Sequence, residues 1–463
     1  MNFMIEDLLS IKHLRRMNVD VLHGKRFSGV STDSRAIRRG DVFVALRGEN
    51  FDGHEFIGEA FQRGAVCAVV EGGTKVAAFP GHPMLIVEDT TKTFGKLANV
   101  YRKKFDIPVI VVAGSNGKTT TKEMISAVLG TTYSVLSTEG NLNNHIGVPR
   151  TLFRLHERHE VAVIEAGTNH FGELAYLCRI LEPTHGLITN IGREHLEFFG
   201  NLSGVARAEG EVFTALGRTG TGYVNVDDAR IVAQAGKLRK KISYGFTKSN
   251  VSVAGTSLRR DRQGCFTFSV TPRKKKGFQV QLSVPGEHAM YNALAAAAVG
   301  ISFDVQPKNI KHALKTFSSV GKRMEVKQAG GVTILNDTYN ANPDSVLSAL
   351  ETLQGMNGKG KKIVILGDML EMGDAADREH RTIGETIKNM GFEYILTFGA
   401  KAKNIYRSAK GKFNKHYMNK KSLSNAAFDL LSPSDIVLVK GSRGMKMEEV
   451  VNTLVERLEY KSA

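Results

Sequence analysis

A short glycine-containing loop is the clearest chemical feature of the sequence. It consists of Gly114, Ser115, Asn116, Gly117, Lys118, Thr119 and Thr120. Glycines let consecutive N–H groups and a following helix N-terminus face an anion. In such a loop Lys118 would meet the β- and γ-phosphates of a nucleotide, and the Thr119 hydroxyl would bind Mg²⁺. The general phosphate-loop pattern has a glycine where this chain has Val112. An apolar run before the loop and a helical pattern after it nevertheless favour nucleotide binding over a simple glycine turn.

An acidic residue and a histidine follow two further apolar runs. Glu165 comes directly after residues 161–164, and His195 follows residues 186–189 through a short loop that starts at Asn190. If both runs are parallel strands, their carboxyl ends converge on the crevice beside the phosphate loop. A carboxylate and an imidazole there suit divalent metals that coordinate nucleotide phosphates. Either residue alone is more often a structural hydrogen-bonding group.

Alternating apolar runs and amphipathic stretches predict the elements that position these residues. Residues 109–113 are expected to form a buried strand, and residues 120–129 a helix with one apolar side. The alternation continues with a helix over 172–181, which is typical of a parallel sheet covered by helices. A second series predicts a separate Rossmann-like domain. Its expected strands are 332–335, 362–366, 394–398 and 436–439, and its expected helices are 345–353, 378–390 and 445–458.

The length of 463 residues predicts two or three domains in an α/β chain. We expect a small mixed α/β domain over 1–105, a central ATP-binding domain with a mostly parallel sheet over 106–318, and a Rossmann-like domain over 319–463. A hinge is expected near residues 317–322.

Composition excludes several classes of protein. The sequence has no apolar run long enough to cross a bilayer, and residues 1–20 mix charged and apolar residues unlike a signal peptide. Cys67, Cys178 and Cys265 lie far apart, so we expect buried thiols in a reducing compartment, the cytoplasm. The net charge of +17 is spread along the chain. Its densest cluster, residues 273–276, is expected at a hairpin tip, and no nucleic-acid-binding motif accompanies it, so we predict no nucleic-acid partner.

Several short segments, in order along nearly the whole chain, resemble the Mur ligase family. Residues 32–35, 40–43 and 52–54 are similar to its uridine-nucleotide-binding domain, and 114–120 to its phosphate loop. The remaining matching segments are 141–144, 146–149, 165–169, 195–197, 336–343, 367–371 and 440–443. Segments 336–343 and 367–371 are most similar to family members that add D-alanyl-D-alanine to a UDP-linked muramoyl tripeptide. The Asp-Asn-Pro-Arg motif of the diaminopimelate- or lysine-adding members is missing, and folate-polyglutamate ligases lack the nucleotide-sugar domain.

The resemblance implies an ATP-dependent ligase of peptidoglycan precursor synthesis. The substrate carboxylate would form an acyl phosphate with release of ADP, and the amine of D-alanyl-D-alanine would then displace phosphate. The implied cofactors are ATP and two Mg²⁺ ions, and the implied partners are UDP-N-acetylmuramoyl-tripeptide and D-alanyl-D-alanine. We expect a monomer without membrane insertion. Two alternatives stay open: another amino acid ligase of the family, and a non-catalytic nucleotide-sugar binder.

The resemblance also assigns roles to residues. Lys118 and Thr119 would hold phosphate and Mg²⁺, Glu165 the first metal and His195 the second. Nucleotide contacts are implied for Asn292, Arg323 and Asp337. Substrate contacts are implied for Ser34, Arg35, Asn143, Asn144, Tyr339, Asn340 and Asn342. Two structural alternatives remain: Asn292 could cap a helix, and the last three residues could only shape the turn before Pro343.

One departure from the family concerns a metal ligand. The family usually has Ala-Lys-Gly-Glu, with a carbamylated lysine, where this chain has residues 208–211 with Glu209 in the lysine position. No lysine occurs between residues 188 and 236. We hypothesise that the Glu209 carboxylate replaces the carbamate as a catalytic metal ligand and removes a carbon dioxide requirement. The alternative is a surface glutamate on a helix. Ala289 also stands where the family commonly has Asn, which weakens the expected adenine pocket.

Overall fold

The computed structural model describes residues 3–11, 15–73, 79–248 and 250–462. The chain divides into two compact units. Unit 1 contains residues 1–111, 133–168 and 172–185, and unit 2 contains residues 112–132, 169–171 and 186–463. The boundary passes through strands β8 (Val109–Ala113) and β11 (His185–Ile188), so each unit holds part of both strands.

Unit 1 begins with a five-stranded sheet in the order β2-β7-β6-β5-β4. Strands β4 to β7 pair in parallel, and β2 joins β7 antiparallel. The strands are β2 (Arg15–Met17), β4 (Val30–Ser31), β5 (Val42–Val44), β6 (Cys67–Glu71) and β7 (Met84–Val87), beside a small pair formed by β1 (Phe3–Met4) and β3 (Arg26–Phe27). The helices are α1 (Ile5–Leu9), α2 (Ile57–Gln62) and α3 (Thr90–Arg102). Ile57 of α2 packs with Phe43, Val70 and Met84 in a buried core. This small mixed domain agrees with the expectation for the start of the chain.

The rest of unit 1 contributes parallel strands and two helices. Strand β10 (Val161–Glu165) pairs in parallel with β9 (Val135–Ser137). Helices α5 (Gly147–Leu152) and α6 (Glu173–Leu181) both pack against α3. All five residues of β10 are buried, as expected for a strand of a parallel sheet that is covered on both faces.

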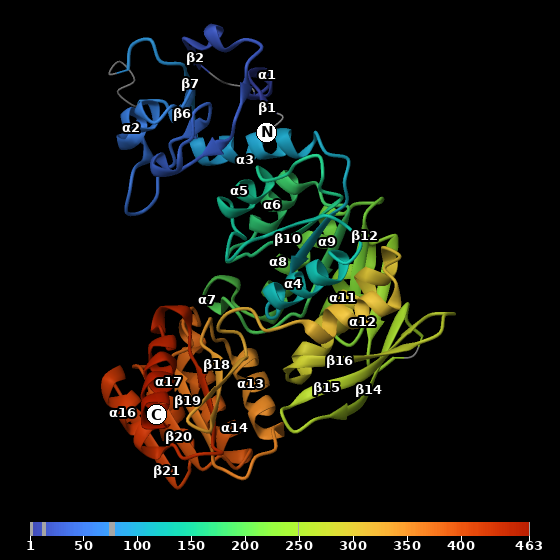
Figure 1. Ribbon diagram of the computed structural model, residues 1–463, viewed down its shortest axis with the longest axis vertical. Helices are drawn as coiled ribbons and strands as arrows, with labels where there is room; N and C mark the ends of the chain where they lie inside the picture. The colour runs from blue at the N-terminus through green and yellow to red at the C-terminus, as the bar shows by residue number, and fades with distance from the viewer. Residues whose placement is uncertain (1–2, 12–14, 74–78, 249, 463) are drawn as a thin grey trace. The chain divides into compact units, whose positions relative to one another are not determined.

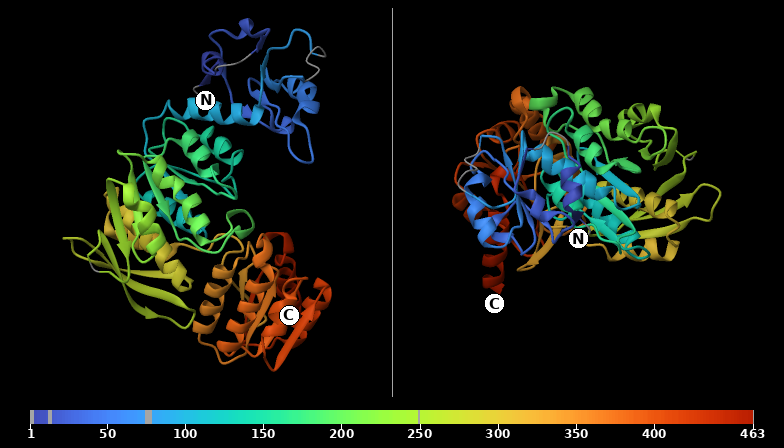
Figure 2. Two further views of the ribbon diagram at one scale, coloured as in Figure 1. Left: turned by 180° about the vertical axis from the view of Figure 1, so that it is seen from behind. Right: turned by 90° about the horizontal axis from the view of Figure 1, so that it is seen from above.

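In unit 2, α4 (Lys118–Leu129) follows the loop after β8. Strands β11 to β16 are neighbours in sequence order: β12 to β14 pair in parallel, and β14 to β16 form an antiparallel extension. The strands are β12 (Thr221–Asn225), β13 (Lys240–Gly245), β14 (Val253–Arg260), β15 (Cys265–Pro272) and β16 (Phe278–Pro285). The helices are α7 (Leu196–Phe199), α8 (Leu202–Glu209), α9 (Glu211–Ala215), α10 (Ala229–Gln234), α11 (Glu287–Ser302) and α12 (Pro307–Thr316). Helices α11 and α12 lie against the antiparallel strands, shown in green and yellow in Figure 2.

A six-stranded sheet forms the last part of unit 2, in the order β17-β18-β22-β19-β20-β21. Only β17 is antiparallel to its neighbour. The strands are β17 (Glu325–Ala329), β18 (Val332–Asp337), β19 (Lys362–Gly367), β20 (Tyr394–Phe398), β21 (Phe413–Tyr417) and β22 (Ile436–Lys440). The helices are α13 (Pro343–Gly355), α14 (Ala376–Asn389), α15 (Lys403–Ser408), α16 (Lys420–Leu430) and α17 (Glu448–Ser462). Figure 1 shows α13 and α14 on one face of the sheet and α16 and α17 on the other. This arrangement confirms the Rossmann-like expectation.

Several boundaries differ from the sequence-based expectation. The helix expected from Thr120 begins at Lys118, so the last three residues of the phosphate-loop segment form its first turn. The last helix, expected from residue 445, begins at Glu448 because Lys446 has a left-handed backbone, with φ of 48°, and ends a short 3₁₀ turn. The basic residues 273–276 lie between β15 and β16, which confirms the hairpin tip. The three cysteines are free and buried, as expected. None of the helices in the described residues is long and apolar enough to span a membrane.

The packing of α11 against α4 gives a test of the core. Helix α11 is rich in alanine and buried along most of its length, and Gly300 approaches α4 so closely that a Cβ would lie 2.5 Å from the Val128 Cγ1. We expect Gly300→Val to lower the free energy of unfolding by about 1–3 kcal/mol, because rigid side chains would overlap. Denaturant unfolding measures this loss. The control is Gly236→Val, where a Cβ meets nothing within 4 Å. Equal stability of the two variants would contradict the packing described.

Candidate nucleotide-binding and catalytic site

The phosphate loop turns sharply between β8 and α4 at two glycines. Gly114 has φ of 114° and Gly117 has φ of 80°, which L side chains rarely adopt. A Cβ on Gly114 would lie 2.7 Å from the Thr189 nitrogen, and a Cβ on Gly117 would lie 2.7 Å from the Asn292 Oδ1. The loop therefore needs glycine for its conformation and for the close approach of neighbours.

Residues that follow β11 hold the other side of the loop. The Thr189 hydroxyl and the Asn190 amide donate to the Asn116 carbonyl at 2.7 and 2.8 Å. In return, the Asn116 N–H donates to the Asn190 Oδ1 at 3.0 Å, and the Ser115 N–H donates to the Asn190 carbonyl at 2.9 Å. The expectation that the loop starting at Asn190 lies beside the phosphate loop is confirmed.

Lys118, the first residue of α4, bends back over the loop. Its ammonium donates to the Ser115 carbonyl at 3.3 Å and to the Gly114 carbonyl, and lies 3.5 Å from the Glu194 Oε2. The helix N-terminus and this ammonium place positive charge at the same point. Such a position suits binding of a polyphosphate.

Glu209 lies at the end of α8, beneath the phosphate loop. Its side chain is only 1% exposed, and its Oε2 accepts a hydrogen bond of 2.6 Å from the Gly114 N–H. Burial raises the pKa of the Glu209 carboxyl, and the neighbouring Glu194 carboxylate raises it further, while Lys118 and the Gly114 N–H oppose the shift. The alternative of a surface glutamate is therefore wrong. Without a cation, this carboxyl keeps its proton above its ordinary range.

His195 is held from the C-terminal sheet. Its Nδ1 lies 2.7 Å from the Oε2 of Glu371, in the segment after β19, and this contact lowers the pKa of the Glu371 carboxyl. Both residues have left-handed backbones, with φ of 46° and 61°. Strained backbone of this kind persists where surrounding contacts enforce it, and it is frequent at functional sites.

Two buried carboxylates have the capacity to bind a cation. In unit 2, the Glu194 Oε1 is buried without a hydrogen-bond partner. In unit 1, Glu165 uses Oε1 to accept from the Asn143 amide at 2.7 Å, and its buried Oε2 has no partner. Oxygen donors of this type fit Mg²⁺. The described residues contain no cluster of three or more His, Cys, Asp or Glu side chains, so they form no complete metal cage of such ligands.

Asn292 lies beside the phosphate loop, but not at a helix end. It occupies the middle of α11 and is 5% exposed, so the helix-capping alternative is wrong. Its Nδ2 is buried without a partner, next to Gly117. An amide with an unused donor at this position suits a ligand that accepts hydrogen bonds. Ala289, one turn earlier, is fully buried.

The segments after β18 and β22 meet in the C-terminal sheet. Asp337 accepts from the Lys440 ammonium at 2.6 Å and from the Met324 N–H at 3.0 Å. The Arg323 guanidinium lies 3.5 Å from the centre of the Tyr339 ring. Both oxygens of Asp337 are therefore engaged within this domain, whereas Arg323 and Tyr339 form one surface.

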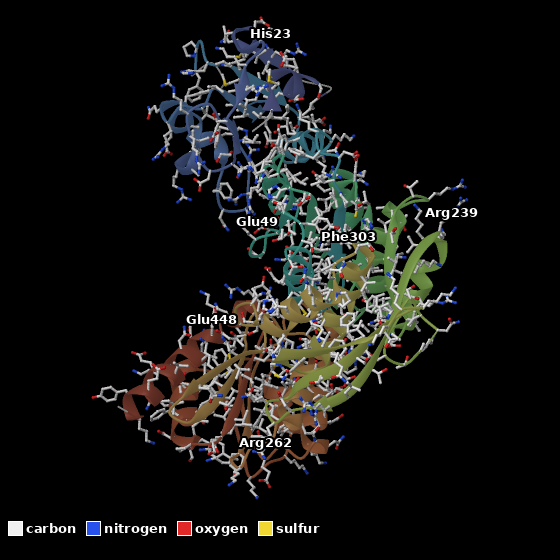
Figure 3. All side chains as sticks on the ribbon, turned by 45° about the vertical axis from the view of Figure 1, so that its right-hand side comes forward. His23, Glu49, Arg239, Arg262, Phe303 and Glu448 are labelled. Atoms are coloured by element: carbon white, nitrogen blue, oxygen red, sulfur yellow. The ribbon has the colours of Figure 1, made fainter. Side chains whose placement is uncertain are left out.

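A cationic region adjoins this surface. Glu448, labelled in Figure 3, accepts from Lys322 at 2.9 Å and from Arg443 at 3.1 Å with the same oxygen. The Arg443 N–H in turn donates to the Asn340 Oδ1 at 3.2 Å. Asn340 therefore joins the turn after β18 to the segment after β22.

Asn342 has both a structural and a site contact. Its Oδ1 accepts from the Ser345 N–H at 2.9 Å and caps α13, so the turn-shaping alternative is confirmed for that atom. Its Nδ2 donates to the Asn116 Oδ1 of the phosphate loop at 2.9 Å. The turn before Pro343 thus reaches the phosphate loop.

Further candidate residues lie in unit 1. Ser34 donates to Glu59 at 2.9 Å, and the exposed Arg35 forms two hydrogen bonds of 2.9 Å with Asp33. Asn144 accepts from the N–H groups of residues 146 and 147, at the start of α5. Ser34 and Arg35 lie together, as do Asn143 and Glu165; these substrate roles stay predictions.

Sequence reasoning assigned no role to several charged residues of the site. Glu194 contacts Lys118, Lys440 contacts Asp337, and Arg193 contacts Asp344. For Glu194 and Arg193, the available signal was that these two adjacent charged residues directly precede His195. Their partners come from distant parts of the chain, which the spacing of residues does not show.

The raised pKa of Glu209 predicts a pH dependence of stability. The ordinary value is 4.5, so between that pH and the raised folded value the native state holds a proton that the unfolded state has lost. Stability of the metal-free protein should therefore fall as pH rises from about 5 to 8. Glu209→Gln should remove this part of the slope in thermal melting curves. The control is Glu157→Gln, on an exposed loop. An unchanged slope in Glu209→Gln would contradict the buried, protonated carboxyl.

Comparison with known proteins agrees with this geometry. Family models match in three consecutive segments: "Mur ligase family, catalytic domain" over residues 26–113, "Mur ligase middle domain" over 112–300, and "Mur ligase, glutamate ligase domain" over 322–443. A UDP-N-acetylmuramoyl-tripeptide–D-alanyl-D-alanine ligase of Bacillus subtilis is 37% identical, over 92% of this chain and 93% of its own. The enzyme of that name from Escherichia coli is 35% identical, over 94% and 97%.

Solved structures extend the similarity to the fold. A structure of MurF from Acinetobacter baumannii matches with a TM-score of 0.90 and 30% identity, covering 98% of this chain and 99% of that one. MurF ligase from Thermotoga maritima, in complex with ADP, matches with a TM-score of 0.84 and 27% identity, covering 94% and 98%. Since relatives above 30% identity cover nearly the whole chain, the chain belongs to the Mur ligase family.

Proposed function

We propose that this protein is an ATP-dependent ligase that joins D-alanyl-D-alanine to UDP-N-acetylmuramoyl-tripeptide. The observation that carries the proposal is the assembly of Lys118, Glu194 and Glu209 around the phosphate loop, in a chain that matches ligases of this name over more than nine-tenths of its length. A degenerate, non-catalytic binder would not need these buried charges, whose burial costs stability.

Each of the three segments of the chain has its own proposed ligand. Residues 1–105 bind the UDP-sugar, residues 106–318 bind ATP, and residues 319–463 bind the incoming dipeptide and close on ATP. Ser34, Arg35, Asn143 and Asn144 would contact the UDP-linked substrate. Tyr339, Asn340 and Asn342 would contact the dipeptide.

In the proposed reaction the carboxylate of the tripeptide attacks the γ-phosphate, and ADP leaves. The dipeptide amine then attacks the acyl carbon of the acyl phosphate, and phosphate leaves as the peptide bond forms. Lys118 and the N–H groups of the loop neutralise charge that gathers on the transferred phosphoryl group. Asn292, Arg323 and Asp337 would orient the nucleotide, and closure of the C-terminal domain would exclude water from the acyl phosphate.

Two Mg²⁺ ions, when bound, would neutralise phosphate charge and polarise the phosphoryl oxygens. Thr119, Glu165, His195 and Glu209 are the residues proposed to hold them, and the orphan Glu194 oxygen adds a fifth donor. Glu209 would supply from the chain itself the carboxylate that the family obtains by carbamylating a lysine.

We further propose that the protein acts as a monomer in the cytoplasm. Three buried free thiols and the use of ATP support this location. Light scattering of the purified protein tests the monomer.

The proposed function is tested by phosphate release with ATP, Mg²⁺, UDP-N-acetylmuramoyl-tripeptide and D-alanyl-D-alanine, omitting each in turn. We expect release only with all four, together with a pentapeptide product by mass spectrometry. Release that is indifferent to the dipeptide but needs another amino acid would assign the chain to a different reaction of the family. Binding of the substrates without any release would refute the ligase.

Replacing the lysine of the loop should separate folding from catalysis. We expect Lys118→Ala to keep its melting temperature within a few degrees but to lose about 10²–10³-fold in kcat, because one electrostatic contact to developing charge is removed. Steady-state phosphate release measures the loss. Turnover at the wild-type rate would contradict the role of the loop.

The Glu209 hypothesis predicts a gain of bicarbonate dependence. Glu209→Lys should be active only when bicarbonate is added, whereas the wild-type protein should be indifferent to it. Phosphate release in degassed buffer, with and without bicarbonate, measures the difference. Full activity of Glu209→Ala would refute a metal-binding role for this carboxylate.

A further inference from the structure

Arg193 joins the loop that carries Glu194 and His195 to the C-terminal sheet. Its guanidinium donates from Nε and Nη2 to the Oδ1 of Asp344 at 3.0 and 2.6 Å, and from Nη1 to the Oε2 of Glu379 at 2.9 Å. The backbone N–H of Arg193 also donates to the Oδ2 of Asp344, at 2.5 Å. Four hydrogen bonds therefore connect this one residue to two helices, α13 and α14.

These contacts differ from an ordinary surface ion pair. The Glu379 side chain is only 7% exposed, and that of Arg193 is 25% exposed. Asp344 lies in the first turn of α13, where the helix dipole stabilises a carboxylate. A guanidinium between two carboxylates in fixed geometry forms strong, directional hydrogen bonds. The arrangement therefore fixes orientation as well as distance.

The close approach of the two segments is built into the backbone. A Cβ on Gly192 would lie 2.8 Å from the Asp344 Oδ2 and 3.2 Å from the Asn116 Nδ2. The Gly192 N–H donates to the Ser115 hydroxyl of the phosphate loop at 2.8 Å. The same glycine thus lies against the phosphate loop on one side and the start of α13 on the other.

The turn before α13 contains the residues proposed to receive the dipeptide. Tyr339 and Asn340 precede Asn342, which caps α13 and contacts Asn116, and Asp344 follows two residues later. Only a few covalent bonds therefore separate the acceptor side from the partner of Arg193. On the other side of this contact, Glu194 and His195 directly follow Arg193 in the chain.

We propose that Arg193 is a positioning residue that couples occupation of the acceptor site to the alignment of Glu194 and His195 over the phosphate loop. The inference rests on the proposed function for the identity of the acceptor. Asp344, two residues after the turn 339–342, and Glu379 hold Arg193, so a dipeptide bound to that turn acts through Asp344 on the position of Glu194 and His195.

The kinetic test compares Arg193→Lys and Arg193→Ala with the wild type. We expect kcat to fall about 10–100-fold and the KM for the dipeptide to rise, since small misplacements of catalytic groups have effects of this size. The affinity for ATP measured without the dipeptide should stay within about threefold. The control is Arg457→Ala, which should leave all constants unchanged, because this guanidinium of α17 makes an exposed contact with Asn425 of α16.

A double-mutant cycle keeps the test decisive if a single variant folds poorly. Arg193→Ala combined with Asp344→Ala should lose no more in kcat than the weaker single variant, to within about threefold, because both changes remove the same contact. Thermal melting of the four proteins gives the coupling of the pair independently of activity. Wild-type constants in Arg193→Ala would overturn the proposal. Equal loss of ATP affinity and kcat would also overturn it, because Arg193 would then only support the phosphate loop.

A wrong acceptor assignment and a wrong role for Arg193 give different results. If the wild-type protein releases no phosphate with the dipeptide but does so with another amine, the acceptor is misassigned, and the same comparison is made with that amine. A dipeptide KM that does not change in Arg193→Lys while kcat falls would overturn the coupling and leave the ligase assignment intact.

Discussion

The site depends on a buried acidic pair held beneath a basic loop. Glu209 and Glu194 lie out of water, next to the Lys118 ammonium and the N–H groups of the phosphate loop. The single Lys118 ammonium does not balance two ionised carboxylates at low dielectric, so one carboxyl retains a proton or a further cation binds. The Gly114 N–H offsets part of this negative charge, since it donates a hydrogen bond to Glu209. A divalent cation would complete the neutralisation, which links the architecture of the loop to the use of metal nucleotides.

The C-terminal sheet brings further charged residues to the site through its strand order. Strand β22 lies between β18 and β19 and is parallel to both, so the segments after these three strands emerge side by side at the same edge of the sheet. Lys440 reaches Asp337 and the Asn340 carbonyl there, and Glu371 reaches His195. Ligands of open α/β sheets bind at such an edge, where the connections diverge. The family segments that appear scattered in the sequence are therefore brought together by the order of the strands.

Much of this fold could be predicted from the pattern of residues. The β-branched run before Gly114 favours a buried strand, and the regular alternation after Arg323 was enough for a Rossmann-like domain. The antiparallel strands β14 to β16 were not predicted as strands, because only their charged hairpin tip was recognised. The start of α17 was misplaced since a left-handed Lys446 has no sequence signal comparable with glycine.

The site was predictable where chemistry is local and not where it depends on tertiary contacts. Lys118 and its glycines form one continuous segment, so their spacing together with the flanking strand and helix patterns identified them. The burial of Glu209, the partner of Arg193 and the position of Asn292 inside α11 depend on segments far away in the chain. A residue can have both a structural role and a contact in the site. In Asn342, Oδ1 caps a helix and Nδ2 contacts the phosphate loop.

The most direct test of this account is calorimetric binding of a magnesium complex of a non-hydrolysable ATP analogue, in buffers with different ionisation enthalpies at neutral pH. If the buried Glu209 carboxyl gives up its proton when the metal nucleotide binds, the wild-type protein should release about one proton more than Glu209→Gln. Equal proton release by the two proteins, with equal affinity, would contradict the central claim that this carboxylate binds the metal beneath the phosphate loop.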